Sequence, residues 1–146
     1  MAKRSINNSH DLNEVFGRLD KLTAETRASW GKMNIRQMLR HVGDAANFAF
    51  DSPNPNAKKK SFMKWMIFNI PAPKNAKTLP EIDQVAKGVD PDDFERERSR
   101  VKELFEKISS SNGPFKVNPF LGELTKDEWG KLCYVHANHH LKQFGV

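Results

Sequence analysis

The sequence predicts an all-α protein that folds as a four-helix bundle with one long crossover between its second and third helices. In four segments the apolar residues recur at steps of three and four, which is the spacing of one face of an α-helix. Residues that favour helix N-termini stand where these segments begin, and no strand-type alternation extends over a useful length. The 146 residues are expected to form a single domain, 1–146, which can bury a core without a disulfide or a structural metal ion.

The first helix is expected over about residues 9–22, with Asn8 or Ser9 as its N-cap. Its apolar positions are Leu12, Val15, Phe16, Leu19 and Leu22. These positions fall on one side of a helix, so we expect this side to face the core.

The second helix is expected to begin near Asn34, because Asn34 and Gln37 have the spacing of a capping box. Its apolar face is wide and includes His41. The helix must end before Pro53 and Pro55, since proline cannot continue the backbone hydrogen bonds of a helix.

The third helix is expected from about Pro91 to Ser110, with Asp90 as its N-cap and Pro91 in the first helical position. Its buried stripe comprises Phe94, Val101, Leu104, Phe105 and Ile108. The fourth helix is expected to run from Thr125 almost to residue 146, because Thr125 and Glu128 form a capping box.

The stretch between the second and third helices contains five prolines and one strongly apolar run, residues 61–70, which can form a short helix. Residues 51–80 hold six lysines and one aspartate, a net charge of +5, out of +6 for the whole chain. This segment is either a crossover that packs on the bundle or a lid over a site, in which its lysines attract an anionic molecule.

Composition excludes several classes of protein. A nucleic-acid binder usually spreads arginines and stacking aromatics over one face, whereas here the basic run is all lysine, so nucleic acid is not an expected partner. A single cysteine, Cys133, excludes a disulfide framework and a cysteine-based zinc finger. No secretory signal and no apolar run of ~18 residues is found, so we expect no membrane span and a cytoplasmic location.

Three histidines are candidate metal ligands. His136 and His140 lie one turn apart on the inward face of the last expected helix, where two imidazoles can bind one ion. His41 is the only other histidine on an apolar helical face. Three neutral imidazoles would hold a divalent ion and leave coordination positions open, which is typical of a catalytic site. Such ligands favour zinc, nickel, copper or iron(II) over magnesium or calcium.

Each of these histidines is also compatible with a core residue whose hydrogen bond is satisfied. Asp44 can accept the second N–H of His41, or pair with Arg40 or with water, and Gln143 can orient a ligand or simply cap the inner seam of its helix. His139 is expected behind the ligands or at the surface. Trp65 is the tryptophan expected to line a pocket.

Two stretches resemble a known family. They are the WGKM…QMLRHV of residues 30–42 and the ending EWGKL…HANHHLKQFG of residues 128–145. Both resemble the DinB-like superfamily and, more narrowly, its uncharacterised DUF1569 branch. This resemblance implies a DinB/YfiT-like four-helix bundle, often dimeric, with a metal held by His41 from the second helix and by His136 and His140 from the fourth.

The resemblance also implies candidate functions. Characterised members of the wider superfamily include metal-dependent transferases and isomerases that activate a low-molecular-weight thiol. The first hypothesis is therefore a metal-binding protein (zinc, nickel or iron) that activates a small thiol for attack on an electrophilic small molecule. The second is a non-catalytic metal- or ligand-binding helical bundle. The third is a peripheral membrane or partner-binding protein that uses the lysines and aromatic residues of 58–68.

Overall fold

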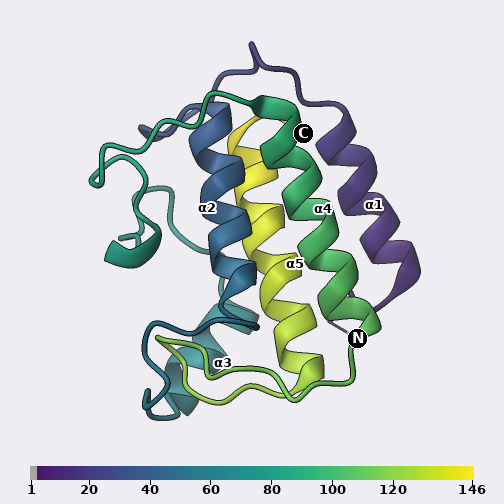
Figure 1. The fold of residues 1–146 in the computed structure, drawn as a ribbon, viewed down its shortest axis with the longest axis vertical. Coiled ribbons are helices and arrows are strands. Elements are labelled where there is room, and N and C mark those ends of the chain that lie inside the picture. The colour runs from purple at the N-terminus through teal and green to yellow at the C-terminus, as the bar shows by residue number, and fades with distance from the viewer. Residues whose placement is uncertain (1–2) are drawn as a thin grey trace.

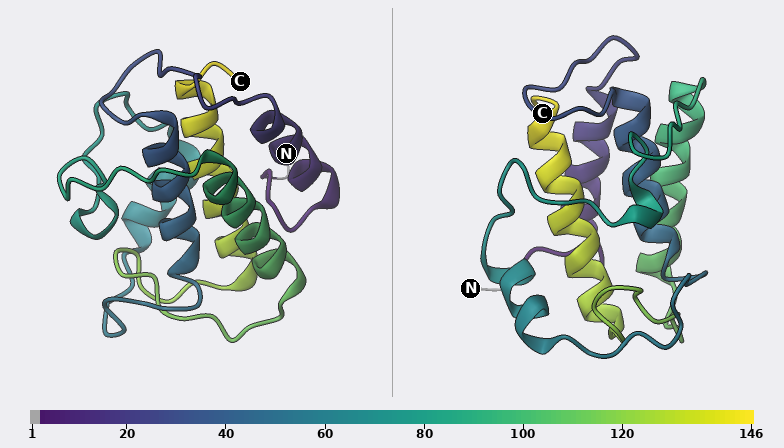
Figure 2. Two further views of the ribbon diagram at one scale, coloured as in Figure 1. Left: turned by 45° about the horizontal axis from the view of Figure 1, so that its top comes forward. Right: turned by 90° about the vertical axis from the view of Figure 1, so that its left-hand side faces the viewer.

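The computed structural model describes residues 3–146, and this part of the chain contains five α-helices and no β-strand. The helices are α1 (Ser9–Asp20), α2 (Ile35–Asn47), α3 (Ser61–Asn69), α4 (Phe94–Ser110) and α5 (Lys126–Gln143), and a 3-10 turn, η1 (Pro80–Ile82), precedes α4. The predicted all-α class is therefore confirmed. The four longer helices lie side by side along the long axis, and α3 packs near the N-terminal end of α5 (Figures 1 and 2).

Side-chain caps explain where three of the longer helices begin. Asn34 with Gln37, and Thr125 with Glu128, each form a complete capping box, in which both side chains bond a backbone N–H of the other residue. Asn8 caps α1 by accepting a hydrogen bond from a backbone N–H of the first turn. These predicted starts are confirmed.

The predicted start of the third long helix was wrong. The helix α4 begins at Phe94, and its N-cap is Asp93, whose carboxylate accepts a backbone N–H of the first turn at 3.0 Å. Asp90 instead accepts a hydrogen bond from the side chain of Asn34 at 2.9 Å. The segment before α4 is thus tied to the N-terminus of α2, which keeps Pro91 out of the helix.

An ion pair between a buried carboxylate and a half-buried guanidinium joins α2 to α4. The Glu97 carboxylate of α4 is only 2% exposed and accepts two hydrogen bonds from the Arg40 guanidinium of α2, at 2.6 and 2.9 Å. A buried carboxylate without such a partner would be strongly destabilising. The pair therefore favours one register between the two helices, beside a core to which both contribute apolar residues.

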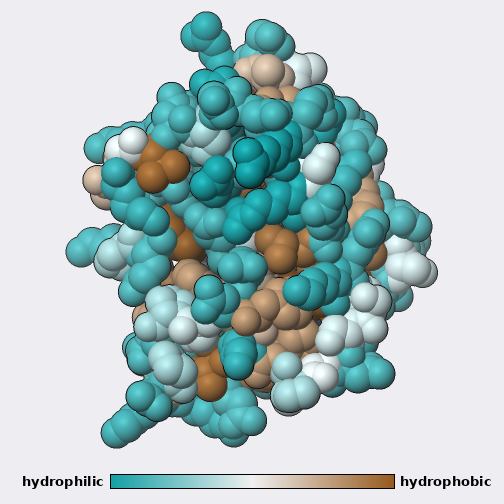
Figure 3. Space-filling model, in the orientation of Figure 1, coloured by the Kyte–Doolittle hydropathy of each residue, from teal (hydrophilic) through white to brown (hydrophobic). Residues whose placement is uncertain are grey.

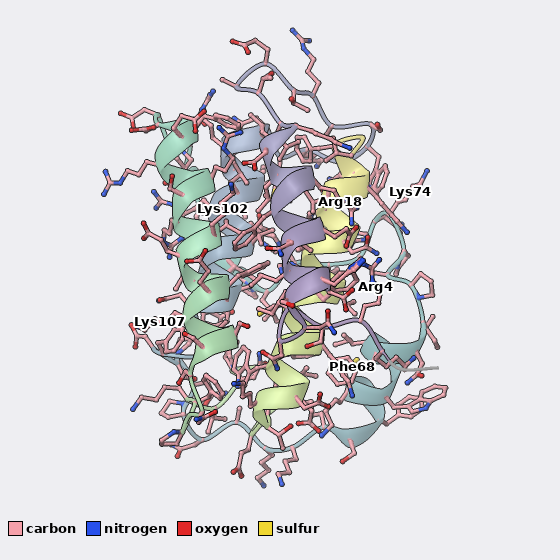
Figure 4. All side chains as sticks on the ribbon, turned by 90° about the vertical axis from the view of Figure 1, so that its right-hand side faces the viewer. Arg4, Arg18, Phe68, Lys74, Lys102 and Lys107 are labelled. Carbon is pink, nitrogen blue, oxygen red and sulfur yellow. The ribbon has the colours of Figure 1, made fainter. Side chains whose placement is uncertain are left out.

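Polar contacts join α1 to α5. Arg18 of α1 extends towards α5 (Figure 4) and donates to the Asn138 side chain at 2.9 Å and to the Val146 carbonyl at 3.0 Å. The Tyr134 hydroxyl of α5 donates to the Glu14 carboxylate of α1 at 3.1 Å. These contacts hold the C-terminal half of α5, where the candidate ligands lie.

Residues 48–93 connect α2 to α4 and include α3, so the short helix expected over 61–70 is confirmed. Met63 and Ile67 of α3 pack against the core, whereas Phe62 and Trp65 are 73% and 54% exposed and stack on each other with ring centroids 6.2 Å apart. Polar side chains cover most of the face drawn in Figure 3, with smaller apolar patches between them. Within residues 3–146 no helix combines the length and the apolar character that a membrane crossing needs.

Candidate metal centre

The three histidines selected from the sequence meet inside the bundle. His41 comes from the middle of α2, and His136 and His140 are one turn apart on α5. Their ring centroids are 4.7 Å apart for His41 with either partner and 4.8 Å apart for the α5 pair. One nitrogen from each ring lies within 4.8 Å of the other two.

Backbone and side-chain oxygens orient two of the rings. Nδ1 of His41 lies 2.9 Å from the Ile82 carbonyl, which only accepts, so Nδ1 carries the proton and Nε2 keeps a lone pair. Nδ1 of His140 lies 2.7 Å from Oε1 of Gln143, and Nε2 of that amide donates to the Trp30 carbonyl at 2.9 Å. The Trp30 contact assigns Oε1 as an acceptor, so His140 also presents an unprotonated Nε2.

The third ring completes a set that fits a metal ion. Nε2 of His136 is 2.8 Å from Nε2 of His41, and two lone pairs at this distance repel unless a proton or a cation lies between them. Nitrogen atoms bound to one zinc ion at 2.0–2.1 Å are at most about 4.2 Å apart, so small ring rotations bring all three into range. The donor set is purely imidazole, without a carboxylate or thiolate.

Burial keeps these rings neutral. Burial is the main reason why the pKa of His41 lies below its ordinary value. Burial also holds the pKa of His136 well below its ordinary value and lowers the pKa of His140 to about 3. A neutral imidazole is the form that binds a metal ion. At neutral pH the site therefore needs no proton release before it can bind a cation.

Asp44 does not accept the second N–H of His41, because the Ile82 carbonyl takes that role. The Asp44 carboxylate instead binds the Arg100 guanidinium at 2.9 Å and the Gln84 side-chain amide at 2.8 Å. The predicted contact of Asp44 with His41 is therefore wrong, and so is its pairing with Arg40, because Arg40 binds Glu97 instead. Sequence reasoning missed the Ile82 carbonyl, since a backbone acceptor has no residue-type signal.

Gln143 lies directly behind a candidate ligand, as one of its two alternatives predicted, and is buried. A Cβ at Gly31 would lie 2.5 Å from Nε2 of Gln143, and Gly31 has φ +86°, so only glycine allows the backbone to come this close. His139 is partly buried beside His140 and Trp30, with ring centroids 5.0 and 6.1 Å away, and lies outside the ligand cluster.

A mostly apolar cavity of about 580 Å³ opens onto the three histidines. Its walls come from α2, α3, α5, the segment after α3 and the loop before α5, with one residue from α4, and α3 contributes Met63, Met66 and Ile67. The prediction that Trp65 lines a pocket was wrong, because α3 turns its methionine and isoleucine side chains inward and leaves Trp65 at the surface. Cys133 lies in the wall, and burial raises the pKa of its thiol to about 12.

Acid should destabilise the metal-free protein through these histidines. Below pH 6.5 an unfolded histidine gains a proton, whereas folded His140 does not until about pH 3, so stability is lost as the pH falls through this range. His140 alone contributes up to about 1.4 kcal/mol per pH unit to the slope of the free energy of unfolding against pH. Urea unfolding at pH 7, 6 and 5 measures this slope, which should become less steep in His140→Gln and stay the same in the exposed-site control His10→Ala. An unchanged slope in His140→Gln would contradict the assignment.

Comparison with known families matches residues 1–145 to the family described as "Protein of unknown function (DUF1569)". This match covers both stretches on which the resemblance to that branch was based. Neither the curated proteins nor the solved structures contain a match to this chain.

Proposed function

The chain belongs to the DUF1569 family, which has no assigned activity, and we propose that it is a metal-binding protein whose ion is held by His41, His136 and His140. The observation that carries this proposal is the convergence of three neutral imidazoles, two of which have Nδ1–H tied to an oxygen so that Nε2 carries the lone pair. Zinc, nickel and iron(II) suit such nitrogen ligands. The resemblance to the DinB-like superfamily supports the same three ligands and a four-helix-bundle arrangement for α1, α2, α4 and α5.

The site fits catalysis better than a structural role. Structural zinc sites are closed by four protein ligands, whereas three protein ligands leave a position for water or substrate. Here that position would face a cavity large enough for a small molecule. The proposal also includes two expectations from the sequence and its resemblance, namely that the protein forms a homodimer and that it is cytoplasmic.

The proposed reaction, as the resemblance implies, is attack by a small thiol on an electrophilic small molecule, in which the thiol gives its proton to solvent and the new sulfur–carbon bond replaces the bond to a leaving group. A divalent ion supplies the charge that lowers the pKa of a thiol, and three neutral imidazoles leave this charge undiminished. Burial raises the pKa of the Cys133 thiol to about 12, so the proposal takes the attacking thiol from solution. The apolar walls of the cavity would hold the electrophile away from water.

Elemental analysis of untagged protein tests the proposal. We expect about one zinc, nickel or iron ion per chain, with loss of the ion in His41→Ala and His140→Ala and retention in the exposed-site control His10→Ala. Circular dichroism establishes that each variant is folded. Wild-type protein without bound metal, also after incubation with zinc, would overturn the proposal.

Turnover distinguishes the enzyme from the non-catalytic bundle. Metal-loaded protein is mixed with glutathione and 1-chloro-2,4-dinitrobenzene, and the absorbance of the thioether product is followed. A rate above background that disappears in His140→Ala supports the transferase. One bound ion per chain with no rate for this or other thiol and electrophile pairs supports the non-catalytic alternative.

A further inference from the structure

Large apolar side chains are exposed together at one place on the described part of the chain. Four such side chains are exposed, and three of them, Phe62, Trp65 and Ile70, lie on α3 or directly after it. Their exposed fractions are 73%, 54% and 47%, and the rings of Phe62 and Trp65 stack on each other. Single exposed apolar residues are ordinary, whereas a group of them is typical of a surface that contacts another molecule or a membrane. We call these three residues the α3 patch.

The α3 patch lies on a helix that is held at both ends. At the N-terminal end, the backbone N–H of Lys60 donates to the Leu121 carbonyl at 3.1 Å. At the C-terminal end, the Lys3 ammonium donates to the Phe68 carbonyl at 2.9 Å. The helix lies at the edge of the molecule, outside α5 (Figures 1 and 2). The patch is therefore presented to solvent in a fixed orientation, and it cannot become buried unless α3 leaves the core.

The same segment carries most of the net positive charge of the protein. Residues 52–80 contain six lysines and neither aspartate nor glutamate. Lys64 pairs with Glu128 at 2.8 Å, whereas the other five lysines form no ion pair with any described residue. The lysines of residues 58–60 directly precede α3 and are exposed, and Figure 4 shows Lys74 at the same edge of the molecule as α3. Apolar and basic groups are thus exposed side by side.

A partner for this surface needs both negative charge and an apolar interior. A second copy of the chain would bring the same lysines and be repelled by them. Single-stranded nucleic acid stacks its bases on separate aromatic rings, whereas Phe62 and Trp65 are nearly parallel, at 16°, and cover each other. A bilayer that contains anionic lipids meets both needs, because its headgroups attract lysines and its interface favours tryptophan and phenylalanine.

We propose that α3 and the lysines beside it form a docking surface for a bilayer of anionic phospholipids, with Phe62 and Trp65 inserted among the headgroups. This inference goes beyond the proposed function and does not depend on a metal ion. It concerns attachment to one face of a membrane, since no helix among residues 3–146 could cross one. Residues 70–73 follow α3, are exposed and line the cavity, so docking would place this side of the cavity next to the lipid.

Co-sedimentation with vesicles tests the inference. The vesicles consist of phosphatidylcholine with about 30% phosphatidylserine, or of phosphatidylcholine alone, at about 0.1 M and about 0.5 M salt. We expect the wild type to bind the anionic vesicles, to bind the neutral ones at least about tenfold more weakly, and to lose affinity at the higher salt concentration.

One pair of variants tests the apolar contribution. Phe62→Ser with Trp65→Ser removes both exposed rings, and Val85→Ser removes the exposed large apolar side chain outside the patch. We expect the first variant to bind anionic vesicles about tenfold more weakly or worse, and Val85→Ser to change binding less than about twofold. Trp65→Ser alone serves where the double variant does not fold, which circular dichroism establishes.

A second pair tests the charge. Lys58→Gln with Lys59→Gln removes two charges beside α3, and Lys21→Gln with Lys32→Gln removes two exposed charges from the loop at the opposite end of the molecule (Figure 1). A lysine near an anionic surface contributes about fivefold to binding, so we expect a loss of about tenfold or more in the first variant. The second variant should change binding less than about twofold, because its lysines lie beyond the screening length.

Three results would overturn the inference. The first is a wild type that does not bind the anionic vesicles. The second is equal binding by the variant without the two rings and by Val85→Ser. The third is a wild-type dimer, seen by analytical ultracentrifugation without vesicles, that becomes a monomer when the two rings are removed, because the patch would then join two copies of the chain.

Discussion

Zinc should raise the free energy of unfolding of the metal-free protein by about 4 kcal/mol when free zinc is near 1,000 times its dissociation constant. The reason is that the three imidazoles converge only in the folded chain, so the ion binds the folded state in preference to the unfolded one. Urea unfolding of chelator-treated protein, with and without added zinc, measures this difference.

Variants identify the source of this stabilisation. His41→Ala should lose nearly all of it, since two ligands on a single helix remain. His140→Gln also removes a candidate ligand but keeps a side chain of similar size, so it replaces His41→Ala in this test if His41→Ala does not fold. His10 is exposed at the start of α1, so His10→Ala should retain the full effect. Equal zinc stabilisation of His41→Ala and the wild type would show that the ion binds elsewhere.

Gln143→Leu should weaken zinc binding by about 10- to 100-fold with the fold intact. This side chain holds Nδ1–H of His140 and is itself held by the Trp30 carbonyl, so its loss frees the ring to rotate and lowers its basicity. Competition with a chromogenic chelator measures the zinc affinity, and the urea midpoint reports stability separately.

Gln143→Glu is the matched control. It keeps an oxygen that accepts from His140, replaces the donor to Trp30 by a second oxygen, and adds a buried negative charge that the bound ion offsets. Its zinc affinity should therefore lie much closer to the wild type than that of Gln143→Leu. Wild-type affinity in Gln143→Leu would mean that Gln143 packs against His140 without orienting it.

Local patterns in the sequence predicted most of the helices. The capping boxes at Asn34 and Thr125 are local, because each involves residues three apart, and both are present. The start of α4 was predicted wrongly because Asp90 is bound by Asn34, more than 50 residues away in the chain. A capping residue can be recognised from the sequence, but a competing partner from another helix cannot.

The candidate ligands were predictable because they follow from local helix geometry, whereas the residues that surround them were not predictable. The spacing of His136 and His140 and the apolar face around His41 follow from helix geometry. Which face of α3 turns inward is decided by packing on α5, because α3 carries large apolar residues on both its inward and its exposed side, and this is why Trp65 was placed wrongly.

The sequence by itself determined the all-α class, most of the helix boundaries and the histidines that share inward faces, because all of these depend on residues within a few turns of each other. Only the tertiary structure decided which groups orient the candidate ligands. The Ile82 carbonyl contacts His41 directly, and the Trp30 carbonyl acts on His140 through Gln143. The tertiary structure also placed these histidines beside a mostly apolar cavity. Backbone acceptors and cavities arise from segments far apart in the chain, and no local pattern encodes them.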